Sequence, residues 1–180
     1  MNNIIKYRNI LPKIDNSSFI ADSARISGDV TIGKNSGIWY GTVIRGDVAK
    51  IKIGNYSNIQ DNSVIHVTRP NHAYNKTGDA GGPTIIGNYV TIGHSAIIHA
   101  CIIEDYCFIG MGAIIMDLAK IESGAMIAAG AVITSGKIVK SGQIWAGNPG
   151  KYLRDLTQKE KDYIKISAEN YWELAQEYII

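Results

Sequence analysis

The sequence has no large excess of charge of either sign, no long apolar run and no signal-peptide pattern. Its 18 Lys and Arg residues and 16 Asp and Glu residues leave a net charge of +2, which is too small to favour nucleic acid or an anionic membrane surface as a partner. No window approaches the roughly 18 continuous apolar residues of a transmembrane helix, and the N-terminus lacks a charged stretch followed by an apolar one. We therefore expect no nucleic-acid partner and no membrane, and we expect the protein in the cytoplasm.

Cysteine is scarce as well. The chain has two, Cys101 and Cys107, which excludes a disulfide framework, and their spacing is not that of a zinc-binding motif. We expect both to be small, buried, apolar side chains, as befits a reducing compartment.

What the sequence does have is isoleucine at intervals of six. Isoleucine occupies every sixth position from 20 to 44, from 53 to 65, from 86 to 98 and from 103 to 133. Six residues turn an α-helix by about 600°, so this repeat cannot form one apolar helix face. Counting each isoleucine as position one, position two is often Gly, position four is often Gly or Asn, and position five is small. Because Gly and Asn tolerate tight bends, this unit predicts a parallel β-helix, and an ordinary β-sandwich does not explain so long a run.

The pattern resembles the left-handed β-helix family, in which three hexapeptides make one triangular coil of eighteen residues. The left hand follows from this resemblance alone. The step of six is broken three times, to nine after Ile44, to twenty-one after Ile65 and to five after Ile98. The longest break is polar and carries Gly, Pro and Asn, so we expect a loop ejected from a corner over about residues 67–84.

From Thr157 onward the composition changes, because the last segment lacks Gly and Pro. Its apolar residues follow the four-three spacing of an amphipathic helix, at Ile164, Ala168, Tyr171, Ala175 and Tyr178. Thr157 with Glu160 fits a capping box. We therefore predict an all-β fold with a terminal helix: an N-terminal segment (1–15), a hexapeptide β-helix (16–152) and a C-terminal α-helix (157–180) packed on the outside.

Two histidines occupy the same position of their hexapeptides. His66 follows Ile65 and His99 follows Ile98. They are 33 residues apart, which is one coil of eighteen plus the fifteen residues that the loop adds to a step of six. We therefore expect them one above the other on one face, about 4.8 Å apart, where two imidazoles can bind one ion.

His94 lies in the preceding hexapeptide and therefore on a different face. It cannot easily reach that ion from within its own chain, but His94 of a neighbouring chain could. Three chains around a threefold axis would then give three equivalent sites, each with two histidines from one chain and one from the next. The alternative is that these histidines are ordinary solvated surface residues.

At these residues the sequence resembles the gamma-class carbonic anhydrases. The matching segments are RGD at 45–47, IKIGNYSNIQDNSVIH at 51–66, IGHSAIIHAC at 92–101, GNPGK at 147–151 and SAENY at 167–171. The three-histidine pattern is specific, whereas the hexapeptides and GNPGK are shared with acyltransferases. The resemblance implies a homotrimer in which His66, His94 and His99 bind zinc, with iron or cobalt as the alternative metals.

The resemblance also implies roles for neighbouring residues. Arg45 and Asp47 correspond to an interface pair, with Asp61 as a further carboxylate partner, and directional Arg–carboxylate pairing would fix the register between chains. Gln60 corresponds to a residue that hydrogen-bonds the water on the metal, and Tyr171 to a tyrosine that approaches a neighbouring site. The alternatives are a weak surface salt bridge for Arg45, a turn residue for Gln60 and packing against the prism for Tyr171.

The implied reaction is the hydration of carbon dioxide to bicarbonate by a metal-bound hydroxide, which three neutral imidazoles favour because they leave the charge of the ion undiluted. The sequence departs from the family at the proton relay. Val48 stands where a glutamate is expected, and the ejected loop offers Asp79 but no glutamate. His72 is the candidate relay, or else a solvated loop residue. Two other functions stay open: a coenzyme A-dependent acyltransferase of the same fold, and a non-catalytic metal-binding or assembly subunit.

Overall fold

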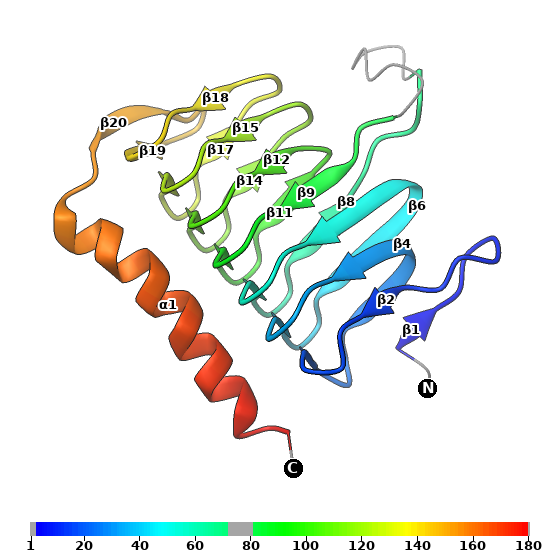
Figure 1. Cartoon of the computed structure of the whole chain (residues 1–180). Helices are drawn as coiled ribbons and strands as arrows, with labels where there is room; N and C mark the ends of the chain where they lie inside the picture. Colours follow the sequence, from blue (N-terminus) through cyan, green and yellow to red (C-terminus); the bar gives the residue numbers. More distant parts are fainter. Residues whose placement is uncertain (1–2, 72–80, 180) are drawn as a thin grey trace.

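The computed structural model describes residues 3–71 and 81–179. Parallel strands wind into a three-sided prism with one helix along its outside (Figure 1). The predicted β-helix with a terminal helix is therefore confirmed. Within these residues, one sheet of twelve strands covers two faces of the prism, because β4 (Arg25–Ile32) and β6 (Val43–Ile53) bend around a corner. A sheet of eight strands forms the third face.

The three faces are named here by their strands. The first face holds β1 (Ile4–Ile5), β8 (Val64–His66), β11 (Ile97–His99), β14 (Ile114–Ile115), β17 (Val132–Ile133) and the first parts of β4 (Arg25–Ile32) and β6 (Val43–Ile53). The second face holds the remainder of β4 and β6 with β2 (Lys13–Ile14), β9 (Thr84–Ile86), β12 (Ile102–Ile103), β15 (Lys120–Ile121) and β18 (Ile138–Val139). The third face holds β3 (Phe19–Ile20), β5 (Gly37–Ile38), β7 (Asn58–Ile59), β10 (Thr91–Ile92), β13 (Phe108–Ile109), β16 (Met126–Ile127), β19 (Gln143–Ala146) and β20 (Lys151–Asp155).

Isoleucine ladders fill the interior of the prism. On the first face, Ile65 is in register with Ile98, and on the third face Ile92 is in register with Ile109. None of these four side chains is measurably exposed to solvent. Burying one such side chain contributes about 1.5–3 kcal/mol, so each buried isoleucine of the repeat stabilises the first and third faces by a similar amount.

The bends between strands fall at position four, as the repeat predicts. Asn62 and Gly112 have φ values of 59° and 66° there, in the left-handed region that these two residue types tolerate. Three tyrosines were not expected at this position. Tyr56, Tyr89 and Tyr106 have φ values of 52°, 54° and 55°, so the chain places bulky rings at bends where Gly or Asn costs less.

All three breaks in the repeat occur at one corner, between the first and second faces. Ile44, Ile65 and Ile98 precede them, and these residues are stacked neighbours in register. The nine-residue step gives β6 extra residues that β4 lacks, so the segment after Gly46 protrudes. The breaks in the six-residue repeat therefore fall where β6, β8 and β11 end their first-face portions; at the far end of the prism, β20 pairs antiparallel with β19 and its register shifts at Ile144.

The C-terminal helix α1 (Gln158–Gln176) runs back along the third face, from the last coils toward the first (Figure 1). The capping box is present, because the Thr157 side chain accepts from the Glu160 N–H and the Glu160 carboxylate accepts from the Thr157 N–H. Its buried residues are Ile164, Ser167, Ala168 and Ala175. Tyr178 lies beyond the end of the helix and is 49% exposed, which differs from its expected place in the apolar stripe.

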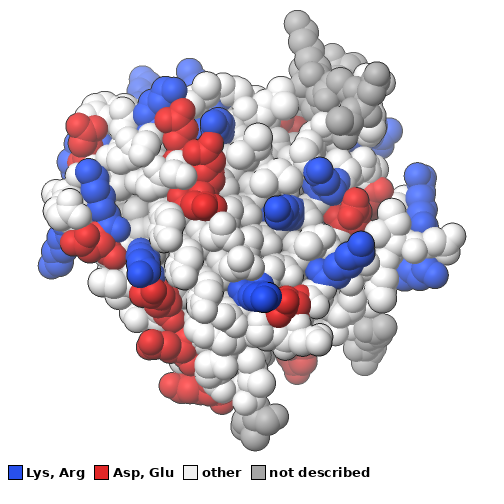
Figure 2. Space-filling view, viewed as in Figure 1, with Lys and Arg blue, Asp and Glu red and all other residues white. Residues whose placement is uncertain are grey.

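The outer surface carries both signs of charge. On the side seen in Figure 2, acidic and basic side chains are interspersed without a broad area of one sign. Among the described residues, no helix is both long enough and apolar enough to cross a bilayer.

Candidate metal centre

His66 and His99 stand directly beside each other on the first face. They are register partners on β8 and β11, and Nδ1 of His66 lies 3.1 Å from Nε2 of His99. Two nitrogen ligands of a tetrahedral zinc ion lie about 3.3 Å apart, given zinc–nitrogen bonds of about 2.0–2.1 Å. The predicted stacking of the two rings is confirmed, and their spacing suits a shared metal; their role as ligands stays a prediction.

Each ring of this pair has a carboxylate on its other nitrogen. Asp47 Oδ1 lies 3.0 Å from His66 Nε2, and Asp117 Oδ1 lies 2.6 Å from His99 Nδ1. The Thr68 hydroxyl donates to the second oxygen of Asp117. Carboxylates in this position orient histidines that bind metals. Both irregular segments contribute, since the nine-residue step carries Asp47 and the ejected loop begins beside Thr68.

Asp117 and Thr68 were not predicted from the sequence. Asp117 lies eighteen residues after His99, so counting one coil forward from that histidine would have found it. Thr68 carries no such signal, because its position depends on how the loop leaves the corner.

The pKa shifts of Asp47, Asp117 and His66 suit metal binding. Burial would raise the pKa of Asp47, but hydrogen bonds from His66 and Arg45 outweigh it and lower that pKa. For Asp117, hydrogen bonds from Thr68 and His99 likewise outweigh burial and lower the pKa. Burial lowers the pKa of His66 against the opposing bond to Asp47. Near neutral pH these shifts favour charged carboxylates at Asp47 and Asp117 and a neutral His66, the form in which imidazole binds a metal.

Arg45 closes one side of this site. Its guanidinium donates to Asp47 of the same chain and its side chain is half exposed. With Val48 and Arg69 it lines a cavity of about 330 Å³ that opens onto the two histidines. The expected pairing of Arg45 and Asp47 across chains stays a prediction.

His94 lies apart from this pair, on the third face after β10. Its Nδ1 lies 2.8 Å from Asp61 Oδ2, and its side chain is 42% exposed. Within residues 3–71 and 81–179 no three His, Cys, Asp or Glu side chains converge on one point. A single chain therefore brings together two of the three predicted ligands, and Asp61 pairs with His94 rather than with an arginine of its own chain.

Gln60 belongs to the His94 side as well. It is buried; its Oε1 accepts from the His94 N–H at 3.2 Å, and its Nε2 donates to Asn58 Oδ1 at 3.1 Å. Asn58 donates to the Thr91 hydroxyl, which bonds Ser167 Oγ of α1 at 3.2 Å. This buried network fixes the Gln60 amide, and it includes three residues that the sequence analysis missed. Ser167 was recognisable as the polar residue within the apolar face of the helix.

Tyr171 also lies on the His94 side. It lines a largely apolar cavity of about 320 Å³ together with Gln60 and His94. Its ring packs edge-on against Trp39, with centroids 5.6 Å apart. Burial raises the pKa of Tyr171, and the charge of Asp61 adds to the effect. Tyr171 therefore packs on the prism and borders the cavity beside His94 at the same time.

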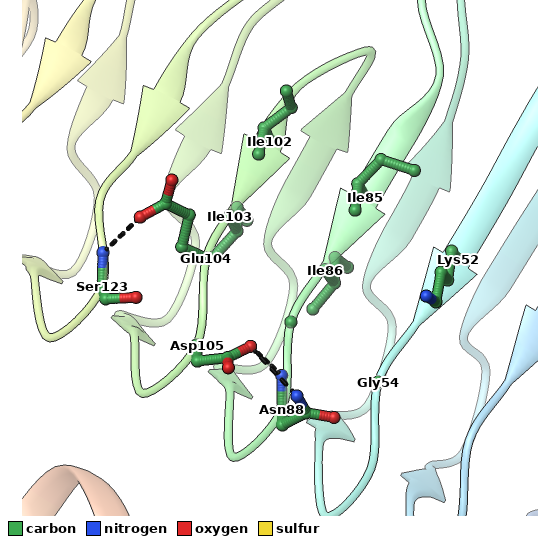
Figure 3. A pocket seen from close by; sticks show the side chains of 11 residues that line it. Lys52, Gly54, Ile85, Ile86, Asn88, Ile102, Ile103, Glu104, Asp105 and Ser123 are labelled. Atoms are coloured by element: carbon green, nitrogen blue, oxygen red, sulfur yellow. Dashed lines mark hydrogen bonds between the residues drawn. The ribbon is translucent and has the colours of Figure 1, made fainter.

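A cavity of about 370 Å³ on the second face lacks such chemistry. Among the described residues, Ile85 and Ile102 line it, and no histidine or cysteine does (Figure 3). The Asp105 carboxylate in it accepts from the Asn88 N–H at 2.7 Å, and the Glu104 carboxylate accepts from the Ser123 N–H at 3.0 Å. The candidate relay residue His72, and Asp79 in the same loop, lie outside the described residues.

Comparison with known proteins gives consistent results. The family model described as bacterial transferase hexapeptide (six repeats) matches residues 100–135. The chain is 48% identical to gamma carbonic anhydrase 2, mitochondrial, of Arabidopsis thaliana over 92% of its own length, and it spans 58% of that relative. It is 46% identical to a carbonic anhydrase of Geobacillus kaustophilus, with 97% of this chain and 90% of the relative covered.

A solved structure matches over nearly the whole fold. It is that of a hexapeptide transferase family protein from Anaplasma phagocytophilum, with a TM-score of 0.89, 51% identity and 97% of both chains covered. The likeness therefore includes the C-terminal helix as well as the coils.

Proposed function

The chain belongs to the gamma carbonic anhydrase family, and we propose that it catalyses the reversible hydration of carbon dioxide at metal sites shared between subunits of a homotrimer. The main support is the pair of facing nitrogens of His66 and His99, 3.1 Å apart, with His94 on a different face. Because two of the histidines lie on the first face and the third lies on another, one chain alone cannot complete a site of three histidines. A closed ring of three copies would complete every site at once.

The residues of the pair fit a divalent metal. Zinc is the metal we propose, with iron or cobalt as alternatives, because neutral imidazole suits all three. His94 of a second copy would bring the nitrogen donors to three and leave one position open, as in catalytic zinc sites. When bound, the metal would supply the activated water that adds to carbon dioxide.

The third face would supply the other wall of the site. Gln60 presents an amide that its bonds to Asn58 and the His94 backbone hold in place, so it could orient a water molecule without reorganising. Phe108, Met126 and Tyr171 make the adjoining cavity largely apolar. An apolar approach suits carbon dioxide, which has no charge to solvate.

Proton transfer is the step for which the described residues offer least. Val48 borders the His66–His99 cavity, and the carboxylates of Asp47 and Asp117 there are already bonded to the two histidines. We therefore expect turnover to depend strongly on the buffer concentration, because buffer must accept the proton.

Stopped-flow hydration of carbon dioxide by metal-loaded trimer tests the proposal. Zinc protein is measured first, then iron and cobalt protein under reducing conditions, with His94→Ala as the matched control. We expect a rate above buffer that the control lacks. No rate above buffer with any of the three metals would contradict the proposed activity.

Acyl transfer from coenzyme A is the second candidate, favoured by the family model and by the hexapeptide transferase structure. Such an enzyme needs one histidine as general base and has no use for three that converge. Tight binding of acetyl coenzyme A that is unchanged after metal removal would favour acyl transfer over hydration.

A non-catalytic metal-binding or assembly subunit is the third candidate, and Val48 is the residue that favours it. Full metal content with no hydration in any assay would support this role. For location we propose the cytoplasm, since both cysteines are buried free thiols, as is usual in reducing compartments.

A further inference from the structure

Three tyrosines form a ladder along the corner between the second and third faces. The rings of Tyr56 and Tyr89 are stacked with centroids 4.9 Å apart and planes at 5°, and those of Tyr89 and Tyr106 with centroids 5.1 Å apart and planes at 8°. Trp172 of α1 packs edge-on against Tyr56 at the first end of the ladder. Each ring above the first thus covers the face of the ring below.

The ladder stops although the corner continues. The next residue at this bend is Gly124, whose N–H donates to the Asp105 carbonyl just as the Tyr106 N–H donates to the Asn88 carbonyl. Gly124 and, one coil further, Gly142 both have φ of 72°. A methyl group added at Gly124 would have Ser141 Oγ, 3.9 Å away, as its nearest contact. The rung above Tyr106 is therefore open, and the upper face of that ring is uncovered.

A cavity of about 340 Å³ occupies this open rung. Its walls are Tyr106, Gly124, Ser141, Gly142, Lys161 and Ile164. Tyr106 is 41% exposed, whereas Tyr56 and Tyr89 are half-buried within the ladder. The Tyr106 ring thus forms one side of the cavity, small glycine and serine residues form another, and α1 borders it with Lys161 and Ile164.

Lys161 places a positive charge above the open rung. Its Nζ lies 3.9 Å from the position that a Cβ on Gly142 would take, one coil beyond Gly124. Among residues 3–71 and 81–179, no carboxylate pairs with this ammonium group in the structure. Glu122, which accepts from the Ser141 N–H, is already paired with Lys140. The lysine is therefore available to a ligand.

We propose that this cavity is a binding site for a planar aromatic carboxylate. The ring of the ligand takes the empty rung over Gly124, stacks on Tyr106 as Tyr106 stacks on Tyr89, and has the Lys161 ammonium on its other side. Offset stacking and a nearby cation both favour an aromatic ring over a saturated one, and the cation favours a negatively charged substituent. The site lies away from the three histidines and does not depend on the proposed hydration reaction.

Binding of naphthalene-2-carboxylate, measured by isothermal titration calorimetry on the assembled protein, tests the site. Decahydronaphthalene-2-carboxylate is the saturated control. We expect one saturable site per chain for the aromatic acid and binding at least about tenfold weaker for the saturated one, because stacking on an aromatic side chain is worth roughly a tenfold or larger change in affinity.

Substitutions then locate the site. Gly124→Tyr would complete the ladder with a fourth ring in a conformation that three tyrosines already adopt, and it should abolish binding. Gly136→Tyr is its matched control, because Gly136 has φ of 70° with open space around it at another bend, and it should bind as wild type. Lys161→Met should weaken binding several-fold.

Tyr106→Asn replaces the ring with a residue that tolerates the bend, and it should also abolish binding. Melting temperatures show which variants remain folded; if Tyr106→Asn does not fold, Gly124→Tyr decides the question. No saturable binding to wild type at millimolar ligand, equal binding of the saturated acid, or unchanged binding by Gly124→Tyr would each overturn the proposal.

Discussion

The first and third faces share one core but differ on the outside. On the inside, Ile98 and Ile92 occupy equivalent rungs of two ladders and are equally buried. On the outside, the first face ends at the corner that carries the breaks in the repeat and bears two histidines held by carboxylates. The parallel strands of the third face, from β3 to β19, keep their register, and α1 packs on this face. The six-residue repeat thus determines which side chains point inward. The breaks in the repeat determine which polar side chains meet on the outside.

The two faces also hold their polar groups differently. Asp47 and Asp117 hold the His66 and His99 rings by charged hydrogen bonds at the edge of a cavity. Gln60 is held in a buried neutral network that ends on Ser167 of the helix. We infer that the first face is built to bind an ion and the third face to orient what approaches it.

Removing a histidine should affect the two faces unequally, and this is the largest effect that we expect. His99→Ala leaves one imidazole on the first face and should remove most bound metal, because zinc affinity falls steeply with each lost ligand. His94→Ala leaves the His66–His99 pair and should retain weak binding. Metal content of dialysed protein measures both. Full metal in His99→Ala, at unchanged oligomeric state, would contradict the ligand assignment.

Substitutions in the core should destabilise the protein by similar amounts on the first and third faces. Ile98→Ala and Ile92→Ala each remove a fully buried side chain, so each should lower the free energy of unfolding by about 2–5 kcal/mol. Denaturant unfolding of metal-free protein at a fixed concentration gives the comparison. A much larger loss on one face would show that the core, and not only the surface, distinguishes them.

Substituting the carboxylates that bond the histidines should have a smaller effect on metal binding, and the effect should differ between Asp117 and Asp61. Asp117→Asn should weaken zinc binding about tenfold to a hundredfold, as expected for a carboxylate that orients a histidine ligand. Asp61→Asn should cost less, because Asp61 bonds His94 nearer to solvent. Competition with a chromophoric chelator measures both affinities, and Thr68→Val tests the support of Asp117. Equal effects at Asp117 and Asp61 would remove this distinction.

Acid should loosen the start of the helix on the third face. Hydrogen bonds from Arg154 and Thr157 lower the pKa of Glu160 from 4.5 to about 2. Its contribution to stability is therefore complete above about pH 4.5 and is lost as the pH falls through about 2. Amide hydrogen exchange of α1 over this range should show the loss. Glu160→Gln should remove that pH dependence, and an unchanged profile in the variant would contradict the cause.

The fold was readable from the sequence because one physical rule repeats. Isoleucine every sixth residue specifies the ladder, and counting through the loop placed His66 beside His99, since register in stacked coils is arithmetic. Asn58 and Thr91 could not be found in this way, because their partner Ser167 lies on a helix that no repeat positions. The tyrosines at the bends broke the local rule, and they mark the second site that we propose.

Reconstitution from two defective chains tests the central claim, that each site is shared between the first face of one chain and the third face of another. Trimers of His99→Ala alone and of His94→Ala alone should lack tight metal sites. Unfolding the two variants together at equal concentrations and refolding them should restore tight binding at about a quarter of the sites, because each site then draws its two faces independently. If the refolded mixture had no tight metal sites, or if trimers of His94→Ala alone bound metal tightly at every site, the site would not be shared between chains.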